Sequence, residues 1–244
     1  MIRKLFQTAF AGTSAVGLTG GFSLAVSALS LKDPRNADGA LHLWGRSVLA
    51  AAGVQSAAYG LERIPHGNVV FVCNHQSHYD ALVFLAHVRK HTRWVAKREL
   101  FRIPVFGPAM RLAGNIPVER SGGQGDRSRL SEAVQAVRER VSVMFFAEGT
   151  RSEDGALRPF KKGAAMLAIQ AGVPVVPLAV SGTRLILPKG GRAVQWGQRV
   201  ALVVGEPIST EGLQVQDREA LTQRLEAAVA GLYAEARERS GDLE

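Results

Sequence analysis

Hydrophobic and polar positions divide the chain into an N-terminal part and a longer part in which strand and helix patterns follow one another. From residue 61 onward, short apolar runs bounded by turn residues predict strands, and longer segments with helical spacing predict helices. The predicted strands cover residues 69–72, 93–97, 116–118, 143–146 and 173–180, with one or two more within 193–204. The predicted helices cover residues 81–90, 104–112, 131–140, 164–171 and 213–238. This pattern predicts one α/β domain, a mixed sheet flanked by helices, over residues 61–244.

The N-terminal part contains a long uncharged stretch. Residues 5–31 follow a basic start and include no charged residue, so the stretch is long enough to cross a bilayer. Its many Gly, Ser and Thr residues weaken insertion. A spanning helix, a helix lying in the membrane interface, a cleaved signal peptide and a buried core helix all fit the pattern. We favour membrane attachment by one of the first two.

A second, amphipathic helix is predicted after the turn at residues 32–36. Leu41, Trp44, Val48 and Ala52 recur at helical spacing, and Gln55 lies off that stripe. The two helices would form a hairpin that docks on lipid, or the second would simply cover the sheet. We therefore treat residues 1–60 as N-terminal membrane-associating helices. In residues 61–68 the pattern predicts a turn or a short edge strand.

Composition and charge narrow the class of ligand. The chain has 46% hydrophobic and 21% charged residues, as an ordered globular protein does, and its formal net charge is +9. A basic chain suits phosphate-bearing ligands, anionic membrane surfaces or acidic carriers. Nucleic acid is disfavoured because basic and aromatic residues do not interleave. The single cysteine, Cys73, excludes internal disulfides and fits a buried strand position.

The candidate chemistry begins where the first predicted strand ends. His75 follows that strand, and Asp80 opens the next predicted helix. On one helix these two side chains would not face each other, but they can meet if His75 is still in the turn. Asp80 would then hold one imidazole nitrogen, while the other takes a proton from a hydroxyl. The alternative is a chance pair without catalytic meaning.

Several rival chemistries lack their usual motifs. Neither G-x-G-x-x-G nor G-x-x-x-x-G-K-[ST] occurs, so nucleotide binding lacks its usual motifs. G-x-S-x-G is also absent, which leaves an α/β-hydrolase nucleophile unsupported. His78 and Asp80 resemble half of a dinuclear metal motif, but Gln76 and Ala81 stand where histidines would be needed. We therefore expect no metal site. A non-catalytic membrane-binding protein remains an alternative that leaves His75 and Asp80 unexplained.

A second segment gives the pair a context. In order along the chain, four elements resemble those of the glycerolipid acyltransferase family, and within it the bacterial 1-acyl-sn-glycerol-3-phosphate acyltransferases. They are N-H-x-x-x-x-D at residues 74–80, G-x-x-x-x-x-R at 114–120, F-x-E-G-T-R-S at 146–152 and V-P-V-x-P at 173–177. The resemblance covers roughly residues 60–210. It departs at Ala147, where the family most often has proline.

The resemblance implies roles for individual residues. His75, with Asp80, would be the general base for transfer of an acyl group. Lys97 would polarise the thioester carbonyl, although an ordinary surface lysine is the competing interpretation. Arg120 and Arg151 would clamp the acceptor phosphate, as bidentate guanidinium forks can. The remaining implied substrate-binding residues are Glu148, Gly149 and Thr150. Glu148 could hydrogen-bond the acceptor's glycerol, or it could steady Arg151 or His75. A purely structural pair of Glu148 with Arg151 is the competing interpretation.

The resemblance also implies an activity. The enzyme would transfer a fatty acyl group to the sn-2 hydroxyl of 1-acyl-sn-glycerol-3-phosphate, forming phosphatidic acid, at the cytoplasmic face of a bacterial inner membrane. No cofactor is expected, because acyl-coenzyme A or acyl carrier protein serves as co-substrate. Another lysolipid acceptor, such as lyso-ornithine lipid or a lysophospholipid, is the alternative. Acyl chain length, the choice of donor and the oligomeric state stay open.

Overall fold

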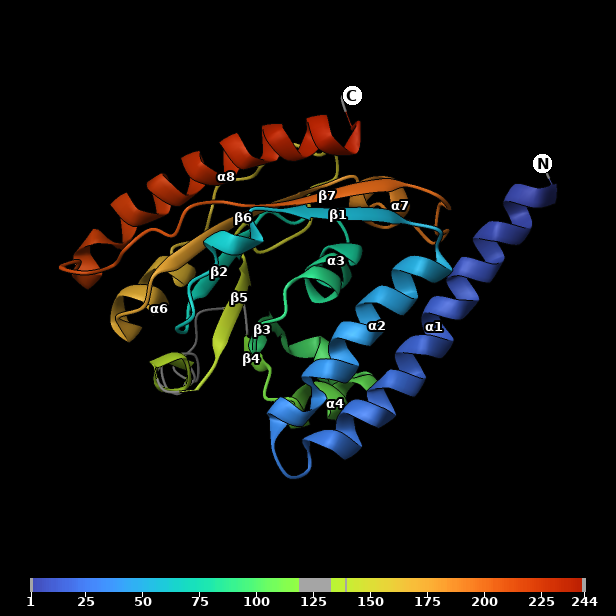
Figure 1. The fold of residues 1–244 in the computed structure, drawn as a ribbon, viewed down its shortest axis with the longest axis horizontal. Helices are drawn as coiled ribbons and strands as arrows, with labels where there is room; N and C mark the ends of the chain where they lie inside the picture. Colours follow the sequence, from blue (N-terminus) through green and yellow to red (C-terminus); the bar gives the residue numbers. More distant parts are fainter. Residues whose placement is uncertain (1, 119–132, 139, 243–244) are drawn as a thin grey trace.

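The fold is built on one mixed seven-stranded sheet. A computed structural model describes residues 2–118, 133–138 and 140–242. The strand order is β1-β7-β6-β2-β5-β3-β4, and β6 and β7 are antiparallel while every other neighbouring pair is parallel (Figure 1). The strands are β1 (Gln55–Tyr59), β2 (Val70–Cys73), β3 (Thr92–Lys97), β4 (Ile116–Val118), β5 (Ser142–Phe146), β6 (Val175–Ser181) and β7 (Arg199–Val204). The predicted α/β class with a mixed sheet is confirmed.

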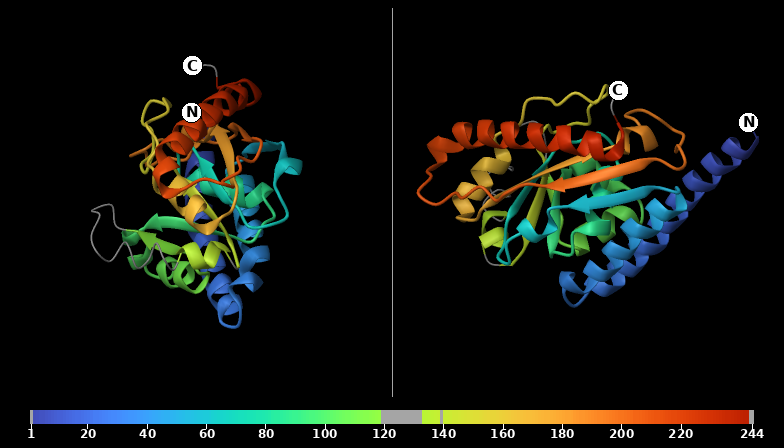
Figure 2. Two further views of the ribbon diagram at one scale, coloured as in Figure 1. Left: turned by 90° about the vertical axis from the view of Figure 1, so that its left-hand side faces the viewer. Right: turned by 45° about the horizontal axis from the view of Figure 1, so that its top comes forward.

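Helices cover both faces of this sheet (Figure 2). The α-helices are α1 (Ile2–Ser30), α2 (Asp38–Ala51), α3 (Tyr79–His87), α4 (Phe106–Leu112), α6 (Gly163–Ala171), α7 (Thr183–Ile186) and α8 (Arg218–Ser240). Four 3₁₀ turns also occur in the described residues, η1 (Pro34–Ala37), η2 (Leu61–Arg63), η3 (Arg98–Arg102) and η4 (Val215–Asp217). The predicted helix at residues 131–140 lies partly outside the described residues.

The central strand β2 joins the two halves of the core. Its side chains alternate between the faces of the sheet, as strand geometry requires. Val70 and Val72 belong to the apolar cluster under α6 and α8, whereas Phe71 belongs to the cluster with α2 and α3. All four residues of β2 are buried, and its neighbours β5 and β6 are both parallel to it. The carboxyl ends of these three strands therefore meet at one edge of the sheet.

The edge strand β1 was missed by the sequence pattern. Gln55 was placed with the second helix, but α2 ends at Ala51, and Gly53 then adopts a positive φ of 63° that a helix does not continue through. The five residues of β1 are weakly apolar, and β1 pairs only with the distant β7. It lies before the predicted boundary at residue 60 and still belongs to the sheet.

The structure decides between alternatives that the sequence left open for three further segments. Prolines suit a sheet edge or the ends of a strand, and Pro174 does precede β6, but Pro177 lies within β6, inside the sheet between β2 and β7. The pairing with β7 shifts by one residue between the Val175–Ile208 bridge and Leu178–Val204, and Pro177 lies at this irregularity, where a sheet tolerates proline. Of the one or two strands predicted within residues 193–204, the structure contains one, β7. Of the turn or short edge strand predicted in residues 61–68, it contains the turn η2.

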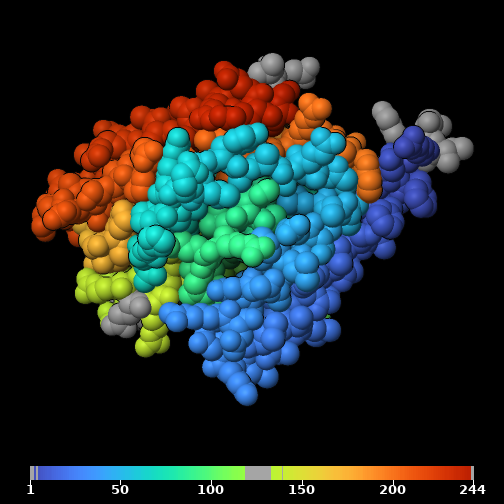
Figure 3. Space-filling model, in the orientation of Figure 1, coloured from blue at the N-terminus to red at the C-terminus, as the bar shows by residue number. Residues whose placement is uncertain are grey.

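The N-terminal helices form a pair. α1 runs beside α2 along one side of the molecule (Figure 3) and also contacts α4. Ala11 and Val26 of α1 are buried there, but Phe6 and Val16 are 70% and 76% exposed. By length and composition, residues 5–30 could cross a membrane, and they are the one such helix in the described part of the chain. The exposure of α1 argues against a buried core helix.

Gly45 determines how closely α2 approaches α3. A β-carbon at this buried position would lie 2.7 Å from the Leu82 carbonyl oxygen, well inside van der Waals contact. The two backbones therefore approach each other because one of them carries no side chain. Gly39 of the same helix has no atom within 4 Å of such a β-carbon.

We predict opposite effects on stability for the two α2 glycines. Gly45→Ala forces α2 away from α3 and should lower the free energy of unfolding by about 1–3 kcal/mol. Gly39→Ala should leave it unchanged or raise it by up to about 1 kcal/mol, because alanine is the better helix former. Urea unfolding monitored by circular dichroism measures both. Equal effects of the two substitutions would contradict the close contact at Gly45.

Candidate active site

The candidate site lies at the carboxyl end of β2, where the chain turns into α3. The Nδ1–H of His75 donates to Asp80 Oδ2 at 2.7 Å. The same oxygen accepts the main-chain N–H groups of Gln76 (2.7 Å) and Ser77 (2.9 Å). The predicted contact between His75 and Asp80 is therefore present, with His75 in the turn and Asp80 in the first turn of α3. Because Nδ1 donates, the neutral imidazole leaves Nε2 as a proton acceptor.

The second oxygen of Asp80 also has a partner. Oδ1 accepts a hydrogen bond from the hydroxyl of Thr183, the first residue of α7. Asp80 is 2% exposed, so its charge is stabilised by these four donors rather than by water. Thr183 was missed by the sequence prediction. The sequence shows only that Thr183 follows the strand predicted at residues 173–180; its approach to Asp80 depends on the parallel pairing of β6 with β2.

Aromatic rings fix the plane of the imidazole. The His75 ring stacks on Phe146 with centroids 3.9 Å apart and an interplanar angle of 11°. Phe146 in turn lies 5.6 Å from Trp94 at 26°. The His75 side chain is still 17% exposed, so a substrate hydroxyl can reach it. The ring is thus held on one face and along one edge while remaining accessible.

The loop after β5 holds the main chain of His75 from both sides. Glu148 Oε1 accepts the His75 N–H at 2.6 Å, and Ser152 N–H donates to the His75 carbonyl at 2.7 Å. The other Glu148 oxygen accepts the Arg158 N–H at 3.1 Å. Burial raises the pKa of Glu148 to about 7, and the nearby Asp80 charge also raises it. Of the predicted roles for Glu148, its contacts favour steadying His75; among the described residues it forms no ion pair with Arg151.

Gly149 lets a cation approach the same loop. Its φ is +70°, and a β-carbon there would lie 2.7–3.0 Å from Cε, Cδ and Nζ of Lys161. In this structure the space beside Gly149 is therefore occupied by the Lys161 side chain, and the implied substrate-binding role of Gly149 stays a prediction. The main-chain N–H of Lys161 donates to the Ala147 carbonyl at 2.8 Å, which fixes its segment against the loop.

The predicted phosphate-binding residues are only partly described. Thr150 and Arg151 are half-buried on the loop after β5. Arg151 lies next to Ser152, whose N–H donates to the His75 carbonyl, and so stands near the turn between β2 and α3. Burial lowers the pKa of His78, and the nearby Arg151 charge lowers it further. Arg120 lies outside the described residues, so the predicted clamp of two arginines is not tested.

Lys97 is not brought to His75 by any described contact. It ends β3, which is separated from β2 by β5. Its ammonium forms an ion pair with Glu99 at 3.0 Å, and the side chain is 49% exposed. The role of Lys97 toward a developing oxyanion therefore stays a prediction. Among the described residues, no group of three or more His, Cys, Asp or Glu side chains is placed to hold a metal ion.

Two more side chains position the turn between β2 and α3. Asn74 is fully buried and accepts the Val180 N–H at 2.8 Å while donating to the Val180 carbonyl at 2.9 Å. The Gln76 amide donates to the hydroxyl of Tyr233 from α8, and that hydroxyl donates to the Gly155 carbonyl at 2.8 Å. Sequence reasoning did not assign these roles, because the partners lie more than 100 positions away for Asn74 and Gln76.

Comparisons with known proteins agree with this geometry. The family model described as "Acyltransferase" matches residues 55–181, more than half of the chain. A chloroplastic 1-acyl-sn-glycerol-3-phosphate acyltransferase of Arabidopsis thaliana is 35% identical over 170 residues, 69% of this chain and 48% of that protein. The Escherichia coli 1-acyl-sn-glycerol-3-phosphate acyltransferase is 39% identical over 119 residues, 48% of this chain and 49% of that protein.

A solved structure covers more of the chain. The crystal structure of the 1-acyl-sn-glycerophosphate (LPA) acyltransferase PlsC from Thermotoga maritima aligns with a TM-score of 0.80 and 29% identity, covering 98% of this chain and 99% of that one. The chain spans about half the length of the curated relatives it matches. The family expected from the sequence motifs is confirmed: this chain belongs to the acyltransferase family.

Proposed function

We propose that the protein transfers a fatty acyl group from an acyl thioester to the sn-2 hydroxyl of 1-acyl-sn-glycerol-3-phosphate, forming phosphatidic acid. The observation that carries the proposal is the hydrogen bond from His75 Nδ1 to the buried Asp80 carboxylate, which leaves the second ring nitrogen for a proton. The activities for which the relatives and the structural neighbour are named support the same acceptor.

The proposed reaction is a direct transfer without an acyl-enzyme. Nε2 of His75 takes the proton of the sn-2 hydroxyl while the hydroxyl oxygen bonds to the thioester carbonyl carbon. Asp80 stabilises the imidazolium that forms. The tetrahedral oxyanion then collapses, the carbon–sulfur bond breaks, and the leaving thiolate takes the proton from the imidazolium. Acyl-coenzyme A or acyl carrier protein supplies the acyl group, and no cofactor takes part.

The acceptor phosphate is assigned to Arg151, with Thr150 beside it and Arg120 as the second guanidinium. The guanidinium of arginine is planar and permanently charged, which suits a phosphomonoester. The Arg151 charge lies near enough to His78 to lower its pKa, after the larger effect of burial. Lys97 or main-chain N–H groups would stabilise the oxyanion. Glu148 supports the His75 main chain rather than the substrate.

Membrane attachment belongs to the same proposal. α1 exposes large apolar side chains along much of its length, including Leu5, Phe6, Val16 and Leu24. We place this helix in or on the cytoplasmic face of a bacterial inner membrane, where a lysolipid acceptor and a soluble thioester donor can meet. Another lysolipid acceptor remains the alternative, and a non-catalytic membrane protein would not need the His75–Asp80 geometry.

Replacing the proposed base tests the function directly. His75→Ala should lower kcat for phosphatidic acid formation by about 10²–10⁴-fold, because the hydroxyl loses its proton acceptor. The assay offers lysophosphatidic acid, an uncharged lysolipid and lyso-ornithine lipid, each with acyl-coenzyme A and acyl carrier protein as donors. His66→Ala, in the loop before β2, is the matched control and should keep full activity. Undiminished turnover by His75→Ala would refute the general-base role, whereas His75-dependent transfer only to another acceptor would overturn the phosphate clamp.

Arg151→Ala should act on the acceptor rather than on the donor. Loss of a charge-assisted contact to phosphate should raise the KM for lysophosphatidic acid roughly tenfold or more, with little change in the KM for the thioester. Arg192→Ala removes the same charge from an exposed loop and should change neither constant. Steady-state kinetics with each substrate varied in turn measures the two KM values separately. An unchanged acceptor KM in Arg151→Ala would remove this residue from the phosphate site.

Thr183→Val tests a residue that positions Asp80. Without the hydroxyl, one buried carboxylate oxygen loses its donor, so kcat should fall roughly tenfold while both KM values stay nearly constant. Thr183→Ser should restore the rate because it restores the hydroxyl. Thr210→Val removes a buried hydroxyl that bonds the Val173 carbonyl, away from the site, and serves as the control. Equal activity of the valine and serine variants would contradict the positioning role.

A further inference from the structure

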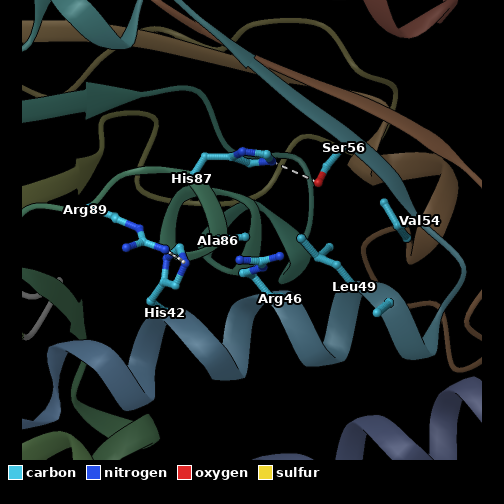
Figure 4. Close-up of a pocket in the computed structure, with 9 residues that line it drawn as sticks. His42, Arg46, Leu49, Val54, Ser56, Ala86, His87 and Arg89 are labelled. Atoms are coloured by element: carbon cyan, nitrogen blue, oxygen red, sulfur yellow. Dashed lines mark hydrogen bonds between the residues drawn. The ribbon is translucent and has the colours of Figure 1, made fainter.

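A cavity lined by basic side chains lies apart from the turn between β2 and α3. It has a volume of about 410 Å³ and is formed by α2, the start of β1 and the C-terminal end of α3 (Figure 4). Its nine lining residues include His42, Arg46, His87 and Arg89, and none of the nine is acidic. Two guanidinium groups and two imidazoles therefore surround one space, as the close-up shows.

Hydrogen bonds fix both imidazoles of the cavity. His42 Nδ1 lies 2.9 Å from the Leu85 carbonyl, and its Nε2 lies 3.3 Å from the Arg89 guanidinium. Because a guanidinium can only donate, Nε2 accepts, and His42 is the neutral tautomer with its proton on Nδ1. His87 Nε2 lies 2.9 Å from the hydroxyl of Ser56 in β1. Arg89 and both histidines are thus held in place before any ligand binds.

The positive charge in this cavity is not neutralised by the protein. Among the described residues, neither Arg46 nor Arg89 pairs with a carboxylate, although Arg93 pairs with Asp38 at 2.8 Å close by along the chain. Burial and the nearby Arg46 charge lower the pKa of His87, so the local field at this imidazole is positive. An unpaired cationic concavity concentrates anions.

We infer that this cavity is a binding site for a phosphate group, as a monoester or diester, separate from the acceptor site. Guanidinium forks match phosphate oxygens bidentately, and two of them are supplied here, by Arg46 from α2 and by Arg89 from the loop after α3. Leu49 and Val54 give the cavity an apolar wall that suits the carbon part of a phosphate ester.

The cavity is distinct from the proposed acceptor site. None of the residues assigned to catalysis or to acceptor binding lines it. Asp80 lies in the first turn of α3 and His87 at its last residue, so the two sites are about 10 Å apart along this helix. α2, which supplies His42 and Arg46, packs along α1, so the phosphate could come from a lipid headgroup as well as from solution.

The test follows the imidazole signals of His42 and His87 in the full-length protein in neutral detergent. Long-range nitrogen–proton spectra are recorded during titration with inorganic phosphate, and signals are assigned with His42→Gln and His87→Asn. Phosphate should shift both signals saturably, whereas chloride at equal ionic strength should not. Arg46→Gln combined with Arg89→Gln should raise the apparent Kd roughly tenfold or more, because two charge-assisted contacts are lost.

A matched pair of substitutions controls for net charge. Arg192→Gln with Arg224→Gln removes the same charge from exposed positions elsewhere and should leave the Kd unchanged. Circular dichroism checks that every variant is folded. Equal weakening by both pairs, identical shifts with chloride, or shifts confined to His75 and His78 would overturn the proposal.

A second arm distinguishes the two sources of phosphate. The protein is mixed with phosphatidylcholine vesicles that either contain or lack phosphatidic acid. If phosphatidic acid vesicles shift the His42 and His87 signals in the native chain but not in Arg46→Gln/Arg89→Gln, the ligand is a lipid headgroup. If only dissolved phosphate does so, the ligand comes from solution. If neither does, the proposal fails.

Discussion

The arrangement of the site depends on one buried carboxylate. Asp80 is 2% exposed, and an ionised carboxylate in that position is costly unless donors replace its water. Four donors do so: the His75 ring, two main-chain N–H groups of the same turn and the hydroxyl of Thr183. These donors come from the loop after β2 and from the segment after β6. All four hydrogen bonds to the carboxylate therefore form only when β2 and β6 are paired in the correct register. This pairing links the fold to the orientation of the His75 ring.

The loop after β5 completes this arrangement from the other side. β2 lies between β5 and β6, and both are parallel to it, so the carboxyl ends of the three strands lie side by side at one edge of the sheet. Glu148 and Ser152 bind the N–H and carbonyl of His75, while Phe146 supports the ring. A histidine held through its main chain, ring face and Nδ1 keeps one free edge. That is the preorganisation a general base needs to act without rearranging at each turnover.

Positive charge lies at both of the sites that we propose to bind phosphate. The chain carries a formal net charge of +9, but much of it is paired or spread over the surface. Arg151 brings charge to the turn between β2 and α3, where an acceptor phosphate would sit. Arg46 and Arg89 bring it to a second concavity beside the α1–α2 pair, with two histidines and no acidic lining residue. Each of the two sites supplies guanidinium groups, which suit phosphate.

The sequence by itself determined the family, the α/β class, most strand positions and the contact of His75 with Asp80. These features rest on local information: apolar runs, turn residues and short motifs within a few residues of one another. Only the tertiary structure decided the rest. β1, the interior position of β6 and the roles of Asn74, Gln76 and Thr183 depend on partners far along the chain, such as Val180 and Tyr233. The basic cavity likewise joins residues from α2, β1 and α3 that no local pattern connects. Hydrogen bonding and packing between distant segments are set by strand pairing and helix contacts, which the linear order of residues does not display.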